Sequence, residues 1–342
     1  MTEDRLAGRR FRRLWAAPLV AMARLLWRPH ALAPRPDWRF GVPGRGFMPL
    51  ARVALIRCLR ALAFEAPLKL RWHGGITALV DLGAEVDEVV FVTGSYEPNE
   101  MAFVASMLQP GMTALDVGAN VGWFTLTMAS RVGPQGTVVA FEPSPRERAR
   151  LDEEVDRNRL SWVKVRSEAL YDTSATLQLH LADLAHCGHN TLGGFIYQGV
   201  EEVQSVAVVA ERLDALLPSL ALTRLDLVKI DVEGSELRVL KGAAATLRRY
   251  RPAILMEVQP ASLHQLGDDL AALEAFLAEL GYSVCSFDPE TGLPSVDRSL
   301  PLTANVVALS REAEDRLLRS GVMTSPVAPR PDPGAGFFPA AP

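Results

Sequence analysis

Short apolar runs alternate with longer amphipathic segments between about residue 99 and residue 310. The apolar runs are rich in Val, Ile and Leu, as is typical of parallel strands that are buried on both faces. They predict strands over Thr113–Val117, Thr137–Phe141, Val163–Ser167, Leu225–Ile230, Ala253–Val258, Tyr282–Phe287 and Asn305–Leu309. Strands that alternate with helices predict an α/β fold in which helices cover both faces of a mostly parallel sheet.

The amphipathic segments predict the helices of this fold. They run over Glu100–Leu108, Gly122–Arg131, Pro145–Arg157, Ser235–Tyr250 and Asp268–Leu280. Asn99 and Ser235 are candidate N-caps, because short polar side chains accept hydrogen bonds from the first amides of a helix. Gly281 predicts the end of the last helix, since glycine adopts the left-handed conformation at low cost.

Two segments break the alternation. Leu177–Val209 alternates polar and apolar residues and contains Gly193-Gly194, which predicts an inserted hairpin or lid at residues 177–209. Trp72–Ser95 contains the runs ITALV and EVVFVTG, which predict a small β element that leads into the main fold.

Composition excludes several classes of protein. Hydrophobic residues make up 49% and charged residues 22% of the chain, so the chain can bury a core and is not wholly disordered. No window reaches the roughly 18 consecutive apolar residues that a membrane-spanning helix needs. Three scattered cysteines give no disulfide framework, which favours a reducing, cytoplasmic location.

Charge is uneven along the chain. Residues 1–71 hold 15 Lys and Arg against 4 Asp and Glu, whereas the remainder holds 21 basic and 36 acidic residues. Arg9, Arg10, Arg12 and Arg13 precede an apolar stretch. Three interpretations stay open for this arm: a signal peptide, an interfacial helix on anionic lipid, or an extension that packs on the body or is solvated. No aromatic-interleaved basic platform indicates nucleic acid.

The chain is therefore expected to divide into four parts. Residues 1–70 form a basic extension, residues 71–98 the small β element, residues 99–312 the main α/β domain, and residues 313–342 a C-terminal segment. That segment ends in a proline-rich stretch from residue 326, which predicts a disordered tail.

The strongest local motif is TALDVGANVGWFTLTMA, in which a strand ends at Asp116 and a helix opens after Gly122. Glycines such as Gly118 suit this turn because a Cβ would block the close approach of a ligand. The spacing lacks the G-x-G-x-x-G of a dinucleotide site. Asp116 would repel a pyrophosphate but suits the sulfonium and ammonium charges of S-adenosylmethionine. Glu142, at the end of the second strand, is placed to accept hydrogen bonds from ribose hydroxyls.

A second group of ionisable residues follows a later strand, in KIDVEGSE. Lys229, Asp231 and Glu233 are two residues apart, so they are expected to share one face of an extended chain. Glu257 ends the next strand and is expected at the same edge of the sheet. These four residues are candidates for the acceptor-side chemistry, and a cluster that only braces the loop is the alternative.

The insert adds three histidines: His180, His186 and His189 in and before HCGHNTLGG. As part of a lid, one of them is a candidate base. As ligands, His186, Cys187 and His189 have no evident fourth partner and no standard zinc spacing, so no metal is expected. A solvated loop is the third interpretation.

The motifs DVGANVGWFT, AFEP, KIDVEGSELRVLKGA and RPAILMEV, with SYEPNE at Ser95–Glu100, resemble the FkbM family of S-adenosylmethionine-dependent methyltransferases over about residues 94–310. The resemblance implies a seven-stranded, Rossmann-like class I methyltransferase fold and methyl transfer, usually to a hydroxyl oxygen. The implied acceptor is a small molecule, sugar or glycan. One departure is Gln259 in MEVQP, where the family often carries histidine.

The resemblance also implies roles for individual residues. Asp116, Gly118, Asn120 and Gly122 would line the methionine end of the cofactor, Glu142 would bind the ribose, and Asp231 would lie between cofactor and acceptor. Glu168, after the third strand, is a candidate adenine contact. Two other functions stay open: a nicotinamide-dependent Rossmann oxidoreductase and a non-catalytic scaffold with the same fold.

Overall fold

The computed structural model describes residues 16–35, 47–64, 66–296 and 304–324. Arg9 to Arg13 and the proline-rich tail lie outside the described residues, so the predictions for them stay predictions.

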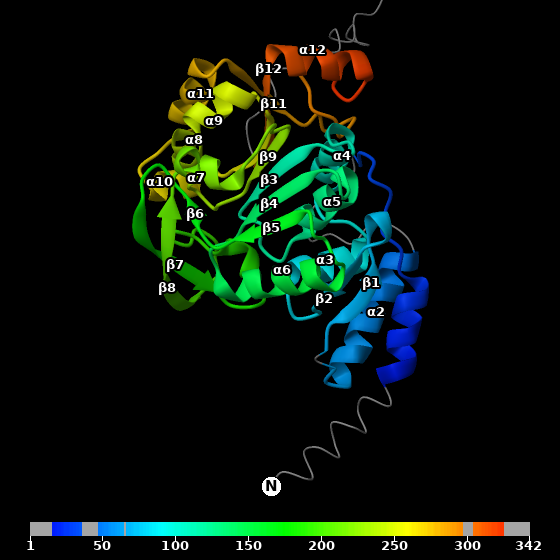
Figure 1. Ribbon diagram of the computed structural model, residues 1–342. Coiled ribbons are helices and arrows are strands. Elements are labelled where there is room, and N and C mark those ends of the chain that lie inside the picture. The colour runs from blue at the N-terminus through cyan, green and yellow to red at the C-terminus, as the bar shows by residue number, and fades with distance from the viewer. Residues whose placement is uncertain (1–15, 36–46, 65, 297–303, 325–342) are drawn as a thin grey trace, which may run out of the picture.

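A seven-stranded sheet forms the centre of the molecule, with the order β11-β12-β10-β9-β3-β4-β5 (Figure 1). Its strands are β3 (Thr113–Val117), β4 (Thr137–Phe141), β5 (Val163–Arg166), β9 (Leu227–Ile230), β10 (Ala253–Val258), β11 (Tyr282–Ser286) and β12 (Ala304–Ser310). Neighbouring strands from β10 to β5 pair in parallel, whereas β12 pairs antiparallel with both β10 and β11. The predicted fold class and all seven predicted strands are confirmed: three strands have the predicted ends, and the ends of the other four differ by one or two residues.

Each face of this sheet has its own apolar core, as a parallel sheet covered on both sides requires. Ala114, Val138 and Leu227 belong to one buried cluster, and their chain neighbours Leu115, Val139 and Val228 belong to the other. The covering helices are α4 (Pro98–Met107), α5 (Trp123–Val132), α6 (Pro145–Arg157), α7 (Leu213–Leu220), α8 (Glu236–Gly242), α9 (Ala244–Tyr250), α10 (Pro260–Gln265), α11 (Leu270–Glu279) and α12 (Arg311–Ser320).

Two helix predictions need correction. The segment predicted as one helix over 235–250 is two helices, α8 and α9, with Ala243 between them. The chain of Tyr171 packs closely here, since a Cβ at Gly242 would lie 1.9 Å from the Tyr171 carbonyl oxygen. Asn99 does not cap α4, which begins at Pro98; its Oδ1 accepts a hydrogen bond from the Arg35 amide at 2.6 Å. Ser235 occupies the cap position of α8 without a side-chain cap hydrogen bond.

The predicted insert is a hairpin. β7 (Ala175–Ala182) and β8 (Glu202–Glu211) pair antiparallel, and β6 (Ala169–Leu170) completes a three-stranded sheet with the order β6-β8-β7. A short helical turn, η2 (Cys187–His189), lies in the connection between β7 and β8. The insert prediction is confirmed, and the insert lies beside α6 and the carboxyl end of the central sheet (Figure 1).

The small β element is only partly β. β1 (Leu68–Arg71) and β2 (Thr77–Val80) pair antiparallel around η1 (His73–Gly75). The run predicted as a second β segment is a helix, α3 (Glu85–Thr93). Acidic residues in its first turn favour a helix through the helix dipole, and Gly94 ends it in the left-handed conformation, with φ of 79°.

The described part of the basic arm packs on the body. A helix spans residues 16–26, and α2 covers Phe47–Ala61. Trp27 is buried, and its Nε1 donates to the Phe91 carbonyl oxygen of α3 at 3.1 Å. Residues 16–35 are therefore part of the folded body. Within the ranges that the structure describes, no helix combines the length and apolarity needed to cross a membrane.

Candidate functional site

A cavity of about 660 Å³ opens at the carboxyl ends of β3, β4, β9 and β10. Its wall is built by the glycine loop after β3, the ends of these strands, the start of α4 and the insert. This is the edge where open α/β sheets bind ligands, and the volume suits a small-molecule site. All the candidate residues except Asp116 line it: Gly118, Asn120, Gly122, Glu142, Glu168, Lys229, Asp231, Glu233 and Glu257.

The two glycines of the loop are required by protein neighbours. Gly118 has φ of 75°, and a Cβ there would lie 1.7 Å from the carbonyl oxygen of Asp231. Gly122 has φ of 100°, and its Cβ would lie 2.5 Å from Leu151 Cδ1. Protein neighbours are thus one reason for these glycines, and the expectation that ligand approach also requires them stays a prediction. The loop after β9 and helix α6 fill the space that side chains would take.

Asp116 faces away from the cavity that it was expected to line. Its side chain is fully buried, accepts a hydrogen bond from Thr125 Oγ1 at 2.5 Å, and lies 4.0 Å from Lys229 Nζ. Burial raises the pKa of Asp116, and the positive charge of Lys229 opposes that rise. These contacts make Asp116 a brace between β3, α5 and β9.

Glu142 is held rigidly at the end of β4. One carboxylate oxygen accepts from the Asn120 amide at 2.7 Å and the other from the Ser144 amide at 2.8 Å. Its burial raises the pKa to about 7, although the two amides favour the ionised form. Because a carboxylate oxygen has two lone pairs, Glu142 keeps capacity to accept hydrogen bonds from a ligand. Glu168, after β5, forms an ion pair with Arg166.

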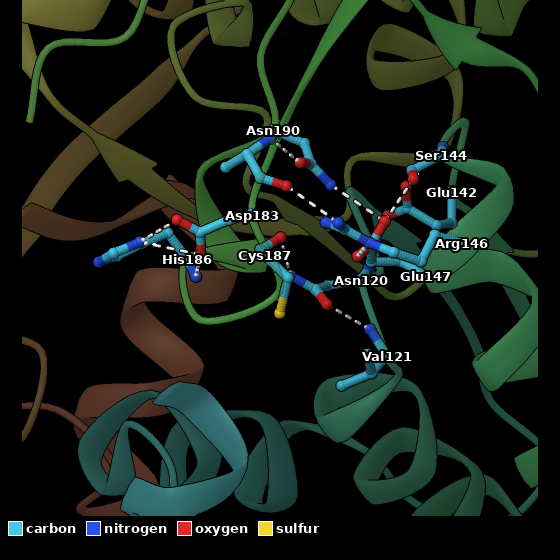
Figure 2. A network of polar contacts seen from close by, with 11 residues as sticks. Asn120, Val121, Glu142, Ser144, Arg146, Glu147, Asp183, His186, Cys187 and Asn190 are labelled. Atoms are coloured by element: carbon cyan, nitrogen blue, oxygen red, sulfur yellow. Dashed lines mark hydrogen bonds and ion pairs between the residues drawn. The ribbon is translucent and has the colours of Figure 1, made fainter. Parts of the chain in front are cut away.

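The glycine loop also holds the insert in place. Asn120 Nδ2 donates to the Cys187 carbonyl oxygen at 3.1 Å. Figure 2 shows the neighbouring contacts, in which Asn190 donates to Glu147 Oε2 at 3.1 Å and Arg146 donates to the Ala182 carbonyl oxygen at 2.9 Å. The insert is therefore bonded to the loop after β3 and to the start of α6 at several points.

Lys229 and Asp231 form the centre of the acid-rich end of the cavity. Lys229 Nζ lies 2.8 Å from Asp231 Oδ2 and 4.8 Å from the centroid of the Phe124 ring. Burial alone would lower the pKa of Lys229, but Asp231 and Asp116 raise it above its ordinary value. Burial, and then repulsion from Asp231, raise the pKa of Glu257 far above its usual range.

Sequence reasoning missed two acids at this end of the cavity. Glu97 and Glu100 begin α4, line the cavity and receive hydrogen bonds from the Asn305 side chain. Glu97 has φ of 40°, and burial with repulsion from Glu100 and Asp231 raises its pKa to about 8. The motif SYEPNE contained the available signal for these acids, because Glu97 and Glu100 lie on either side of Pro98 at the start of a predicted helix.

His189 is the histidine of the insert that contacts the acidic loop. Its Nδ1 lies 2.9 Å from Glu233 Oε1, and its ring centroid lies 4.3 Å from that of Tyr197. Burial lowers the pKa of His189, but the hydrogen bond and charge of Glu233 outweigh it, so the pKa is raised. His186 instead contacts Asp183, and His180 contacts Glu202. Among the described side chains, no group of three or more His, Cys, Asp or Glu residues is arranged to hold a metal ion.

Known proteins share these motifs. The family model of the methyltransferase FkbM domain matches residues 116–284. The 31-O-demethyl-FK506 methyltransferase FkbM of Streptomyces tacrolimicus is 30% identical over 204 residues, which cover 52% of this chain and 75% of that protein. The chain belongs to the FkbM methyltransferase family. The 2-O-methyltransferase NoeI of Sinorhizobium fredii is 29% identical over 43% of this chain and 64% of its own length.

Other relatives are matched over smaller shares of their length. Methyltransferase sdnD of Sordaria araneosa is 34% identical over 37% of this chain and 59% of its own length. The chain spans 57% of Methyltransferase 1 of Beauveria bassiana and 8% of the AMB antimetabolite synthetase AmbE of Pseudomonas aeruginosa. A solved FkbM methyltransferase structure from Methylobacillus flagellatus has 13% identity and a TM-score of 0.36, over 65% of this chain and 52% of that one.

S-adenosylmethionine is the cofactor of FkbM methyltransferases, and the cavity fits it. Five carboxyl groups at its acidic end (Glu97, Glu100, Asp231, Glu233 and Glu257) face one lysine. Their carboxyl oxygens can accept hydrogen bonds from an ammonium group, and the raised pKa values of Glu97 and Glu257 mean that further negative charge is unfavourable here, which disfavours a pyrophosphate. Glu142, at the end of β4, lines the same cavity and accepts a hydrogen bond from the Asn120 amide of the glycine loop.

Proposed function

We propose that this protein is an S-adenosylmethionine-dependent O-methyltransferase that acts on a hydroxyl group of a small metabolite, sugar or glycan. One observation carries the proposal: a single cavity joins the glycine loop and Glu142 to the acidic cluster around Asp231. Two relatives are named for O-methylation, the FK506 methyltransferase and NoeI, which favours oxygen as the atom that accepts the methyl group.

The residues of the cavity divide between cofactor and acceptor. Gly118 and Asn120 would hold the methionine end of the cofactor, Glu142 would accept hydrogen bonds from its ribose, and Glu168 would lie toward the adenine. The cofactor, when bound, supplies a methyl group that a sulfonium already activates. The protein's main task is then to orient the acceptor, and such positioning is worth on the order of 7–11 kcal/mol.

We assign the base to His189, which the insert brings to the cavity. When Nδ1 donates its hydrogen to Glu233, Nε2 is left as the acceptor atom of the ring. In this role Nε2 takes the proton of the acceptor hydroxyl, and Glu233 fixes the ring and stabilises its charge. Gln259 stands where relatives often carry histidine, and it hydrogen-bonds to Tyr197, which packs on His189. The insert would thus supply the imidazole that position 259 lacks.

Binding experiments separate this function from its alternatives. Isothermal titration calorimetry of the wild type should detect S-adenosylmethionine and S-adenosylhomocysteine. Glu142→Ala should weaken both by about 1–3 kcal/mol, because buried ribose hydroxyls lose their acceptor. Glu154→Gln, a change in a buried acid of α6 outside the cavity, should leave both affinities unchanged. Tight NAD binding without S-adenosylmethionine binding would favour the oxidoreductase, and binding of neither would favour the scaffold.

The acceptor can be found by transfer of labelled methyl groups to fractions of a metabolite and glycan extract, with mass spectrometry to locate the methyl group. A methyl group on nitrogen or carbon would contradict O-methylation. In the fraction that the wild type labels, His189→Gln should lower kcat about 10²–10⁴-fold without changing S-adenosylhomocysteine affinity. His186→Gln is the matched control.

Glu233→Gln tests whether Glu233 sets the pKa of the proposed base His189. Glu233 raises the pKa of His189, so its removal should lower that pKa and move the acidic limb of the kcat profile to lower pH. An unchanged pH profile, or full turnover by His189→Gln, would show that His189 is not the base.

A further inference from the structure

The two N-terminal helices carry exposed apolar side chains on their outer faces. In the helix at 16–26, Met22, Leu25 and Leu26 are 41%, 71% and 43% exposed. In α2, Leu50 is 65% exposed. The opposite faces are buried in the core through residues such as Ala23 and Leu59. Each helix is therefore apolar on both sides, although only one side has a partner in the described chain.

The two helices pack on the same part of the body. The inner faces of both helices belong to one buried cluster, and the Arg52 guanidinium of α2 lies 6.0 Å from the centroid of the Trp27 ring. Figure 1 shows the two helices at one end of the molecule, away from the central sheet. Helices that bury their inner faces in a shared core form a layer, and its outer side is a single surface.

The chain segment that contains these two helices is rich in cations. Between residues 16 and 80 the described chain contains eight Lys and Arg and no Asp or Glu. Arg24 of the first helix, Arg28 just after it and Arg57 of α2 are exposed. In the sequence, five further arginines precede the first helix. The rest of the chain is acidic, so positive charge is concentrated where the apolar side chains are exposed.

We propose that the outer faces of the helix at 16–26 and of α2 bind the surface of an anionic lipid bilayer. Leucines interleaved with arginines are the composition of helices that lie in the headgroup region, where the apolar side chains enter the acyl boundary and the cations meet lipid phosphates. A nucleic acid would use the arginines but would leave Leu25 and Leu50 in water.

Helix α2 also borders a space that adjoins the methyltransferase cavity. A second cavity of about 480 Å³ lies between α2, α3 and the insert. It shares Glu85, Ala185 and His186 with the catalytic cavity. A bilayer on the outer face of α2 is thus one helix away from a space that adjoins the site.

Vesicle co-sedimentation of the full chain tests this proposal. Vesicles of phosphatidylcholine with one third phosphatidylglycerol should bind the protein at least tenfold more tightly than pure phosphatidylcholine. Leu25→Glu with Leu50→Glu should lower that binding at least tenfold. The matched control is Val203→Glu with Val209→Glu, which changes side chains of β8 that are 57% and 56% exposed and should have no effect.

A second variant tests the contribution of the arginines to vesicle binding. Arg24→Gln with Arg57→Gln should remove most of the preference for the anionic vesicles while S-adenosylhomocysteine binding stays at the wild-type level. Absence of binding to either vesicle, or equal loss in the β8 control, would overturn the proposal. So would light scattering that shows a dimer dissociated by the leucine variants, with no binding to vesicles, because the surface would then join two copies of the chain.

Discussion

Buried carboxyl groups with raised pKa values are a feature of this protein at the scale of single residues. Burial raises the pKa of Glu142, Glu154 and Glu236 to about 7 and that of Glu97 to about 8. In the cavity, one buried cation, Lys229, lies among several acids. Such groups tend to occur where proteins bind ligands or perform proton transfer, although structural ion pairs also produce them. Glu154 does not line the cavity, so its raised pKa reflects its buried structural position and not ligand binding.

Glu154 provides a prediction on stability. A carboxyl group whose pKa is raised from 4.5 to about 7 stabilises the fold fully below pH 4.5, and this contribution is lost as pH rises through 7. Glu154→Gln should therefore gain stability relative to the wild type between pH 5 and pH 8, by about 1–3 kcal/mol. Urea unfolding at both pH values measures the difference. Glu153→Gln, which changes the exposed neighbouring residue, is the control. If the free energy of unfolding changes with pH equally in the two variants, the raised pKa of Glu154 is contradicted.

At the scale of elements, the insert depends on amide side chains at its base. Asn190 Oδ1 accepts from the Ala182 amide at 3.0 Å, and its Nδ2 donates to Glu147. Asn190→Ala should cost about 1–2 kcal/mol locally and speed amide exchange in residues 183–200, measured by hydrogen–deuterium exchange. Gln178→Ala, an exposed amide on β7, should leave exchange there unchanged. Loss of protection throughout the sheet would show that Asn190 supports the whole fold.

The elements of the central sheet could be predicted from sequence because each strand is a continuous apolar run. α3 could not, since a helix buried on most sides shows the same apolar run as a strand. The break between α8 and α9 could not be predicted from the local sequence either. The carbonyl oxygen of Tyr171, which is distant in sequence, packs against Gly242 at this point.

The candidate site was predictable to a similar extent. Glu142, Asp231 and Glu257 were found because acids follow strand ends. Asp116 follows the same pattern, and only its contacts with Thr125 and Lys229 reveal that it faces inward. His189 was one of three histidines until the hairpin brought it to Glu233. Contacts between residues that are distant in the sequence cannot be predicted from the pattern of residues along the chain.

At the scale of the whole molecule, the N-terminal segment is part of the fold that supports the site. Trp27 packs on Trp72, with ring centroids 6.2 Å apart, and donates to Phe91 of α3. α3 in turn contributes Glu85 and Val86 to the cavity wall. Asp87 connects α3 to the main domain, because it accepts from Trp123 Nε1 at 2.9 Å and pairs with Arg150 at 2.9 Å. A continuous set of contacts thus runs from the basic segment to the cofactor loop.

Trp27→Ala tests this connection. Removal of a buried tryptophan side chain should lower the free energy of unfolding by about 3–5 kcal/mol, and looser packing of α3 should weaken S-adenosylhomocysteine binding. Leu25→Ala, in the same helix but 71% exposed, should change neither quantity measurably. Trp27→Phe keeps much of the packing and loses the hydrogen bond to Phe91, so it should lie between the two. If Trp27→Ala and Leu25→Ala have the same free energy of unfolding by urea, residues 16–35 do not stabilise the body. The position of α3 in the cavity wall is then independent of them.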